Sequence, residues 1–221
     1  MSPSEISITR VNRSETDAET YYSRLSSIYD LLAASEKKFI NRGLELLKPL
    51  SGETILEIGF GTGHAQLIIG EAVKTGLSAG VDLSEGMCRE AQKKAAKAGL
   101  SAAVSLIRNN SLPLPFSNGV MDGVFSSFTL ELFDTPQIPI VLKEFKRVLK
   151  PGGRLVVVSL SKDQPLPWMG RLYEHLHTRY PRMLDCRPIP VQSLISGGGF
   201  EIIQAQVFSM WGIPVSILLA N

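Results

Sequence analysis

The sequence predicts an α/β protein with a doubly wound, mostly parallel sheet, and three features support this class. From Thr54 onward, short apolar runs alternate with segments of helical periodicity, and strands that alternate with helices pair in parallel within a sheet covered on both faces. A turn with three glycines joins the first apolar run to the helix after it. The last two apolar runs follow each other without a helix between them, which predicts a C-terminal antiparallel hairpin.

The apolar runs give the expected strand positions. The parallel strands are expected at Thr54–Ile58, Leu77–Val81, Ala102–Ile107, Val120–Ser127 and Arg154–Leu160, and the hairpin strands at Phe200–Phe208 and Ile213–Leu219. Residues before about Ser51 have a helical pattern and precede the sheet.

Capping residues predict where the helices begin and end. Ser84 can cap the helix after the second strand, and Gly99 suits the end of that helix. Thr135 is expected to cap the helix before the fifth strand, with Pro136 at its first position. A short helix is expected near Gly170–Thr178.

Composition and charge limit the function classes. The chain has 221 residues, 44% hydrophobic and 20% charged, with a formal net charge of +2. This charge is too small to indicate a nucleic-acid partner. The two cysteines have no paired spacing, so neither a disulfide framework nor a metal site is expected, and a reducing, cytoplasmic compartment fits best. The N-terminus lacks a signal-peptide pattern and no apolar run reaches roughly 20 residues, so no integral membrane association is expected.

The glycine-rich turn is the strongest functional signal. Gly59, Gly61 and Gly63 follow the first strand, where a doubly wound sheet binds its ligand. Glycines there let a ligand approach the main chain closely. The dinucleotide pattern G-x-G-x-x-G puts its third glycine where this chain has His64, a bulky side chain, so the match to a dinucleotide site is poor.

Two acids near the turn describe the ligand further. Asp82, at the end of the second strand, can accept hydrogen bonds from ribose hydroxyls. Glu57 precedes the glycines and suits a cationic ligand better than a phosphate. A ribose, a positive charge and no phosphate together describe S-adenosylmethionine.

Three segments in order carry a family resemblance: I-L-E-I-G-F-G-T-G, G-V-D-L-S-E-G-M and V-L-K-P-G-G-R-L-V-V-V. Together they resemble the class I S-adenosylmethionine-dependent methyltransferases. The spacing is closest to the branch with the ubiquinone/menaquinone C-methyltransferases and related phospholipid N-methyltransferases. The resemblance covers roughly residues 21–160. It implies a Rossmann-like, seven-stranded sheet, S-adenosylmethionine as the cofactor, and methyl transfer to a small or lipid-like acceptor.

The resemblance also implies which residues contact the cofactor. The turn of Gly59, Phe60, Gly61 and Gly63 contacts the methionine part, and Glu57 supports the ammonium group of that part through the turn. On the other side of the site, Asp82 holds the ribose while Leu83 and Met87 flank the adenine. Asn110 and Ser111 stand where the family has an acid that receives the adenine amino group, and an amide oxygen can accept the same hydrogen bond.

Further positions follow less directly from the resemblance. Ser126 and Ser127 end the fourth strand and are expected to face the methionine side of the cofactor. The segment Y-Y-S-R-L-S-S-I-Y-D places Tyr22 and Tyr29 in a lid. Glu131, just past the fourth strand, is a candidate general base, although a structural acid is the stronger interpretation.

The expected organisation is therefore a helical lid segment at residues 1–50 and a cofactor-binding domain at 51–221, with a substrate-groove insertion near 161–198. Two other functions remain open. A nicotinamide-dependent oxidoreductase would use the same sheet and ribose acid, although His64 and Glu57 argue against it. A protein that binds S-adenosylmethionine without turnover would carry the same motifs and lack only the acceptor chemistry.

Overall fold

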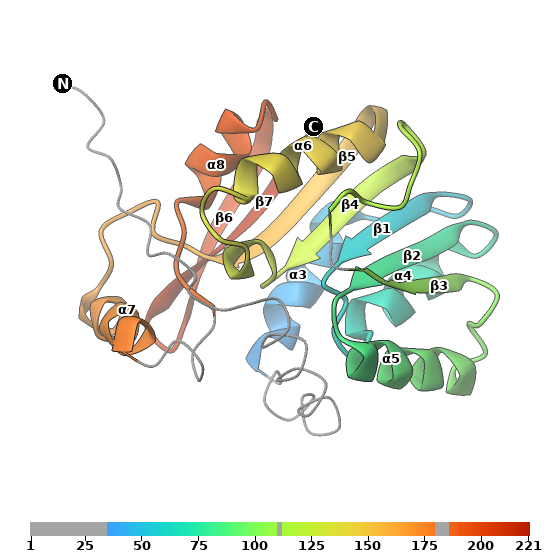
Figure 1. Ribbon diagram of the computed structural model, residues 1–221, viewed down its shortest axis with the longest axis horizontal. Coiled ribbons are helices and arrows are strands. Elements are labelled where there is room, and N and C mark those ends of the chain that lie inside the picture. The colour runs from blue at the N-terminus through green and yellow to red at the C-terminus, as the bar shows by residue number, and fades with distance from the viewer. Residues whose placement is uncertain (1–34, 110–111, 180–185) are drawn as a thin grey trace.

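A seven-stranded sheet forms the centre of the molecule (Figure 1). The computed structural model describes residues 35–109, 112–179 and 186–221. The strand order is β3-β2-β1-β4-β5-β7-β6. The strands are β1 (Thr54–Ile58), β2 (Leu77–Asp82), β3 (Val104–Arg108), β4 (Met121–Ser127), β5 (Leu149–Leu160), β6 (Ile202–Met210) and β7 (Ile213–Ala220). Neighbouring strands from β3 to β5 pair in parallel, and β7 runs antiparallel to both β5 and β6. The predicted doubly wound fold with a C-terminal hairpin is confirmed.

Helices cover both faces of this sheet (Figure 1). One face carries α3 (Lys37–Leu47), α4 (His64–Val73) and α5 (Glu85–Lys97), and the other carries α6 (Ile138–Val148) and α8 (Val191–Gly197). A short 3-10 helix, η2 (Leu130–Leu132), follows β4, and α7 (Trp168–Arg179) lies beside the turn of the β6–β7 hairpin. The strand order reverses between β1 and β4, so a ligand crevice is expected at their carboxyl ends.

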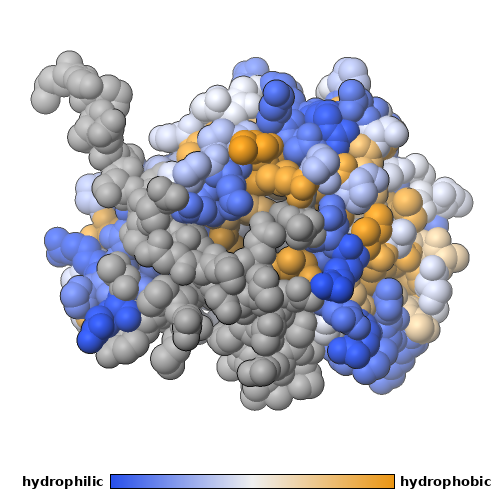
Figure 2. Space-filling model, viewed as in Figure 1, coloured by the Kyte–Doolittle hydropathy of each residue, from blue (hydrophilic) through white to orange (hydrophobic). Residues whose placement is uncertain are grey.

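The core consists of two layers separated by the sheet. Successive side chains of a strand point to opposite faces, and β5 shows this alternation. Leu155 and Val157 belong to the apolar cluster under α6 and α8, whereas Val156 and Val158 belong to the cluster under α3 and α4. Apolar side chains also reach the surface along α6 (Figure 2), where Ile140 is exposed.

The α3 helix is part of this core. Phe39, Leu44 and Leu47 are buried against the sheet. The guanidinium of Arg154 on β5 donates a hydrogen bond of 2.5 Å to the Leu47 carbonyl and forms an ion pair of 2.6 Å with Glu53. These contacts join the C-terminal end of α3 to β5 and to the residue just before β1. Residues 1–34 of the expected lid segment lie outside the described residues.

Helix ends test the capping predictions. The Ser84 hydroxyl accepts a hydrogen bond from the Met87 amide at 3.2 Å, and Gly99 has φ +73° just after α5, so both predictions are confirmed. The prediction for Thr135 and Pro136 is wrong, because α6 begins at Ile138. The Thr135 hydroxyl instead accepts a hydrogen bond from Arg187 at 3.1 Å. The hydroxyl oxygen that was expected to cap the helix therefore accepts a hydrogen bond from a residue distant in the sequence instead.

No helix within the described ranges combines the length and the apolar character that crossing a bilayer requires.

Candidate active site at the carboxyl ends of the parallel strands

The glycine turn after β1 has a backbone that only glycine adopts without strain. Gly59, Gly61 and Gly63 have φ of +73°, +52° and +86°. The turn also packs too closely for side chains. A Cβ on Gly59 would lie 2.9 Å from the Cβ of Thr129, and one on Gly63 would lie 2.8 Å from the Cβ of Ala91. The turn therefore presents main chain rather than side chains at the crevice.

Asp82 holds this turn in place. One carboxylate oxygen accepts a hydrogen bond from the Gly61 amide at 2.9 Å, and the other accepts from the Ser84 amide at 2.8 Å. Burial raises the pKa of Asp82 to about 6, although hydrogen bonds from backbone amides oppose the shift. Each carboxylate oxygen can accept a second hydrogen bond. The residue can therefore shape the turn and still accept from a ligand hydroxyl.

Glu57 lies on β1 directly before the turn and is 2% exposed. Burial raises the pKa of Glu57 to about 8, a hydrogen bond from Gln66 opposes the shift, and the charge of Asp82 adds to it. Among the described residues, its Oε2 atom has no hydrogen-bond partner. An ionised carboxylate in such a place is unstable unless a positive charge lies nearby. The site is thus suited to a cationic ligand.

Gln66 lies against Glu57, although its place in the sequence did not predict a role in the site. Its side-chain amide donates to the Ala79 carbonyl at 3.0 Å, and its amide oxygen accepts from the Ser78 hydroxyl at 2.7 Å. Gln66 is buried in the first turns of α4. A polar residue between Ala65 and Leu67, just after the glycines, is the sequence signal that could have revealed it.

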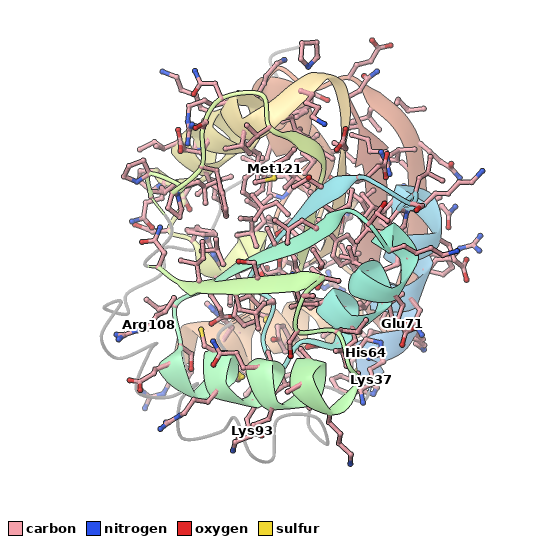
Figure 3. All side chains as sticks on the ribbon, turned by 90° about the vertical axis from the view of Figure 1, so that its right-hand side faces the viewer. Lys37, His64, Glu71, Lys93, Arg108 and Met121 are labelled. Carbon is pink, nitrogen blue, oxygen red and sulfur yellow. The ribbon has the colours of Figure 1, made fainter. Side chains whose placement is uncertain are left out.

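Beyond Asp82, the start of α5 and the end of β3 form the next part of the crevice. Leu83 is half-buried and Met87 is buried. Arg108 lies over the first turn of α5 (Figure 3), where its Nε donates to the Leu83 carbonyl at 3.4 Å. The Asn109 amide donates to the Asp82 carbonyl at 3.0 Å. The predicted pair Asn110 and Ser111 follows at once and lies outside the described residues, as do Tyr22 and Tyr29.

The side chain of Phe60 is 4% exposed and packs against Cys88, Ala91 and Leu106. His64, which the dinucleotide pattern would need as glycine, instead lies within 2.8 Å of the Asn41 side chain on α3.

The end of β4 closes the other side of the crevice. Ser126 pairs in register with Ile58 on β1, and its buried hydroxyl has no partner among the described residues. Ser127 is also buried, and its carbonyl accepts a hydrogen bond from the Thr129 hydroxyl at 2.9 Å. Phe128 between them has φ +48°, so the chain turns sharply here. This turn brings Thr129 against Gly59, a contact that the sequence did not indicate.

Glu131 lies on η2 and is completely buried. Its Oε1 accepts a hydrogen bond from the Leu160 amide at 3.1 Å, and its Oε2 has no partner within the described part of the chain. Burial raises the pKa of Glu131 to about 8. Hydrogen bonds from the backbone and from Ser159 oppose that shift, and the charge of Glu36 adds to it. The carboxyl group thus lies between the ends of β4 and β5 and the start of α3.

Arg187 holds η2 in position, and the sequence analysis missed this residue too. Its guanidinium is 1% exposed and donates to the Glu131 carbonyl at 3.2 Å, the Phe133 carbonyl at 2.6 Å and the Thr135 hydroxyl at 3.1 Å. A buried arginine needs such partners to offset its desolvation. The segment C-R-P-I-P around Arg187 carries no local signal for this role.

Metal-binding groups are not clustered in the described part of the chain, where no three His, Cys, Asp or Glu side chains are placed to hold an ion. His175 is exposed and His177 is buried, so the two histidines on α7 face different sides of the helix. Neither Cys88 nor Cys186 forms a disulfide.

Comparisons with known proteins agree with this geometry. Residues 55–153 match the family model of a methyltransferase domain. The demethylmenaquinone methyltransferase of Symbiobacterium thermophilum is 34% identical over 112 residues, which cover 50% of this chain and 44% of that protein. That of Bacillus subtilis is 26% identical over 192 residues, 80% of each chain. The match spans less than two thirds of the length of the first curated relatives. It covers 44% of one relative and 62% of another.

Solved structures share the fold at low sequence identity. The crystal structure of the [4+2]-cyclase SpnF has a TM-score of 0.77 at 16% identity and covers 95% of this chain and 97% of its own. The geranyl diphosphate C-methyltransferase of Streptomyces coelicolor A3(2), solved with Mg²⁺, geranyl diphosphate and S-adenosyl-L-homocysteine, has a TM-score of 0.67 at 15% identity. It covers 84% of this chain and 77% of its own.

Residues 55–153 therefore match a methyltransferase domain, and the strand order places this stretch in a Rossmann-like, doubly wound sheet. Within that class, its sequence is similar to the demethylmenaquinone methyltransferases. These matches favour the methyltransferase interpretation over the nicotinamide-dependent oxidoreductase alternative.

Proposed function

We propose that this protein transfers the methyl group of S-adenosylmethionine to an apolar, quinol-type small molecule. The observation that carries the proposal is the glycine turn tied to Asp82 above the buried carboxyl of Glu57. The acceptor class is carried over from the demethylmenaquinone methyltransferases to which this chain is similar.

The residues of the crevice suit this cofactor. The backbone of the glycine turn would hold the methionine part, with Glu57 beneath it to balance the ammonium charge. Asp82 would accept hydrogen bonds from the ribose, and Leu83 and Met87 would contact the adenine. The buried hydroxyl of Ser126 and the Oε2 atom of Glu57 have no partner among the described residues, and buried polar atoms normally have one. A bound cofactor would supply such partners.

Other parts of the assignment come from the resemblance alone. Asn110 and Ser111 would approach the adenine amino group. Ser127 would face the methionine side together with Ser126. Tyr22 and Tyr29 would belong to a lid within residues 1–50, and the region near 161–198 would shape the acceptor groove.

When bound, the cofactor supplies a methyl group on a positively charged sulfur. The protein must align the acceptor, exclude water and move protons. A ring carbon of a quinol becomes nucleophilic when the neighbouring hydroxyl gives up its proton. After methylation that carbon loses its hydrogen as a proton and the hydroxyl oxygen regains one, so the net release is one proton for each methyl group transferred.

Glu131 is the residue we assign to accept the acceptor's proton. It lies at the carboxyl end of the sheet, on the β5 side of the crevice, and a base with a pKa near the working pH is efficient in proton transfer. A Glu131→Gln variant that methylates the acceptor at the wild-type rate would remove this role.

The first test is calorimetric titration with S-adenosylhomocysteine, and with NAD in parallel. Binding of S-adenosylhomocysteine alone is expected. Asp82→Ala should weaken that binding by about 1–3 kcal/mol, the cost of a lost buried hydrogen-bond partner. Binding of NAD alone would refute the proposal, and unchanged affinity in Asp82→Ala would remove the ribose assignment.

A second function has an observation in its favour. The [4+2]-cyclase SpnF shares the fold over almost the whole chain. The same fold therefore also occurs in a protein that is named as a cyclase. Product analysis after incubation distinguishes a methyltransferase from a cyclase-like or a non-catalytic protein. Incubation with S-adenosylmethionine and a quinol should yield S-adenosylhomocysteine and methylated product. An acceptor that rearranges without formation of S-adenosylhomocysteine would favour the cyclase-like alternative, and cofactor binding with no chemistry would favour a non-catalytic binding protein.

A further inference from the structure

The exposed face of α7 is unusual for a surface helix. Such helices normally turn their apolar side chains to the core and their polar ones to water. Here the outward face carries three large apolar residues at a spacing of four, Trp168, Leu172 and Leu176, which are 67%, 44% and 38% exposed. Side chains four apart lie above one another on a helix. They form a continuous apolar row rather than scattered exposures.

A second row beside the first is basic. Arg171, His175 and Arg179 are also exposed and are again four residues apart. No acidic residue is exposed among the α7 side chains that the structure describes. The one acid of the helix, Glu174, is half-buried and forms an ion pair of 2.6 Å with Lys162. The outward face of α7 is therefore apolar and cationic at once.

The turn of the β6–β7 hairpin extends this surface. Trp211 at the turn is 67% exposed. The turn touches the start of α7, since a Cβ on the neighbouring Gly212 would lie 3.0 Å from the Cβ of Met169. Both elements lie at the same end of the molecule in Figure 1. We call Trp168, Leu172, Leu176 and Trp211, with the basic row, the α7 surface.

We propose that the α7 surface docks on the face of an anionic lipid bilayer. A helix that lies in the membrane interface pairs an apolar row with arginine or lysine, and tryptophan side chains favour the boundary between headgroups and acyl chains. The cationic row is complementary to the negative potential of such a membrane. Leucine and tryptophan side chains that point into water gain from burial there.

Docking in this orientation would face the candidate active site toward the lipid. The hairpin turn lies past the end of β5, where the Ser161 amide donates to the Pro214 carbonyl at 2.8 Å. This is the edge at which the carboxyl ends of β1 and β4 form the crevice. An apolar acceptor dissolved in the bilayer would then be close to the site. Docking itself does not depend on which acceptor the protein uses.

The chain provides its own probe of docking, because its two tryptophans both belong to the α7 surface. The full-length protein would be mixed with vesicles of phosphatidylcholine alone or with about one third phosphatidylglycerol, and followed by flotation and tryptophan emission. We expect flotation and a shift to shorter wavelength with phosphatidylglycerol vesicles, and quenching when the acyl chains are brominated. Raised salt should weaken binding, because it screens the arginines.

Two variants test which residues are responsible. Leu172→Gln combined with Leu176→Gln keeps both tryptophans and should weaken vesicle binding at least tenfold. Arg171→Glu combined with Arg179→Glu should remove the preference for phosphatidylglycerol. The matched control combines Ile140→Gln on α6 with Lys97→Glu on α5, an exposed apolar residue and an exposed lysine away from this surface, and should bind as the wild type does.

Circular dichroism and S-adenosylhomocysteine titration would establish that each variant is folded. Three results would overturn the proposal: no flotation with any vesicle, equal binding to both lipid mixtures, or a loss in the control as large as in the leucine variant. A dimer in sedimentation whose tryptophans already emit at short wavelength would assign the α7 surface to a second copy of the chain instead. Normal S-adenosylhomocysteine binding without flotation would refute docking and leave the proposed function intact.

Discussion

The two halves of the crevice are built in different ways. On the side of β1 and β2, the residues that shape the site come from one stretch, Glu57 to Met87, and the hydrogen bonds from Gly61 and Ser84 to Asp82 lie within it. On the side of β4 and β5, Glu131 is held by the Leu160 amide and by Arg187, which are distant in sequence. The first half depends on local sequence and the second on tertiary contacts.

A buried glutamate marks each half. Glu57 and Glu131 both have a pKa raised to about 8, mainly by burial, and each has one oxygen without a partner in the described structure. Their surroundings differ. Glu57 lies below a glycine turn and beside Asp82, whereas Glu131 lies beside main-chain amides and Ser159. We therefore expect Glu57 to respond to the cofactor and Glu131 to the acceptor.

The largest effect is expected in the half built by tertiary contacts. Arg187→Leu would leave the carbonyls of Glu131 and Phe133 without their buried donor, and each buried carbonyl left unsatisfied costs about 1–3 kcal/mol. The free energy of unfolding, measured by urea titration, should fall by about 2–6 kcal/mol, the sum for the two carbonyls. Arg42→Leu on the surface of α3 is the control and should cost less than about 1 kcal/mol. Equal losses would mean that Arg187 does not hold this half together.

The next effect concerns the glycine turn. Gly59 and Gly99 both have φ +73°, but a Cβ on Gly59 would meet Thr129 whereas one on Gly99 would meet nothing within 4 Å. Gly99→Ala should therefore cost only backbone strain, about 1–2 kcal/mol of unfolding free energy. Gly59→Ala should cost about 1–3 kcal/mol more, because of overpacking. Its affinity for S-adenosylhomocysteine should fall as well. Equal stability losses in the two variants would show that the contact with Thr129 relaxes freely.

A smaller effect separates the two glutamates. A bound ammonium group favours ionised Glu57, so cofactor binding should release a proton and tighten about tenfold as the pH rises from 6 toward 8. Asp82, with a pKa of about 6, contributes in the same direction at the lower end. Calorimetric titration in buffers of different ionisation enthalpy measures how many protons are released when the cofactor binds.

Glu57→Gln should flatten this pH dependence. Glu131→Gln should leave the dependence unchanged while it slows methyl transfer to the acceptor. If Glu131→Gln alters cofactor binding as strongly as Glu57→Gln does, the proposed division between the two halves is wrong.

The smallest effect is expected at Ser126, whose hydroxyl is buried without a described partner. Ser126→Ala should leave the stability of the ligand-free protein within about 0.5 kcal/mol of wild type, because no hydrogen bond is lost. Affinity for S-adenosylhomocysteine should fall by about 1 kcal/mol if the hydroxyl binds the cofactor. An affinity that does not change would place Ser126 in the core rather than in the site.

This comparison also explains what could be predicted from the sequence. The parallel strands, the glycine turn and the Ser84 cap depend on neighbours in the chain, and the sequence predicts them correctly. Thr135 was predicted to cap α6 and instead bonds to Arg187. No local pattern distinguishes these outcomes, because the partner lies far along the chain. Thr129 was missed for a similar reason, since its importance lies in its contact with Gly59.

The antiparallel strand β7 has a consequence for synthesis of the chain on the ribosome. β5 pairs with β7, so Val156 and Val158 have a bare strand edge beside them until residues 213–220 have emerged. An uncovered apolar edge is a template for pairing with other chains, and pairing between distant strands is slow. Chains that stop before Ile213 should therefore aggregate even though the whole glycine turn and Asp82 are already present. Nascent chains would need protection over the interval between β5 and β7.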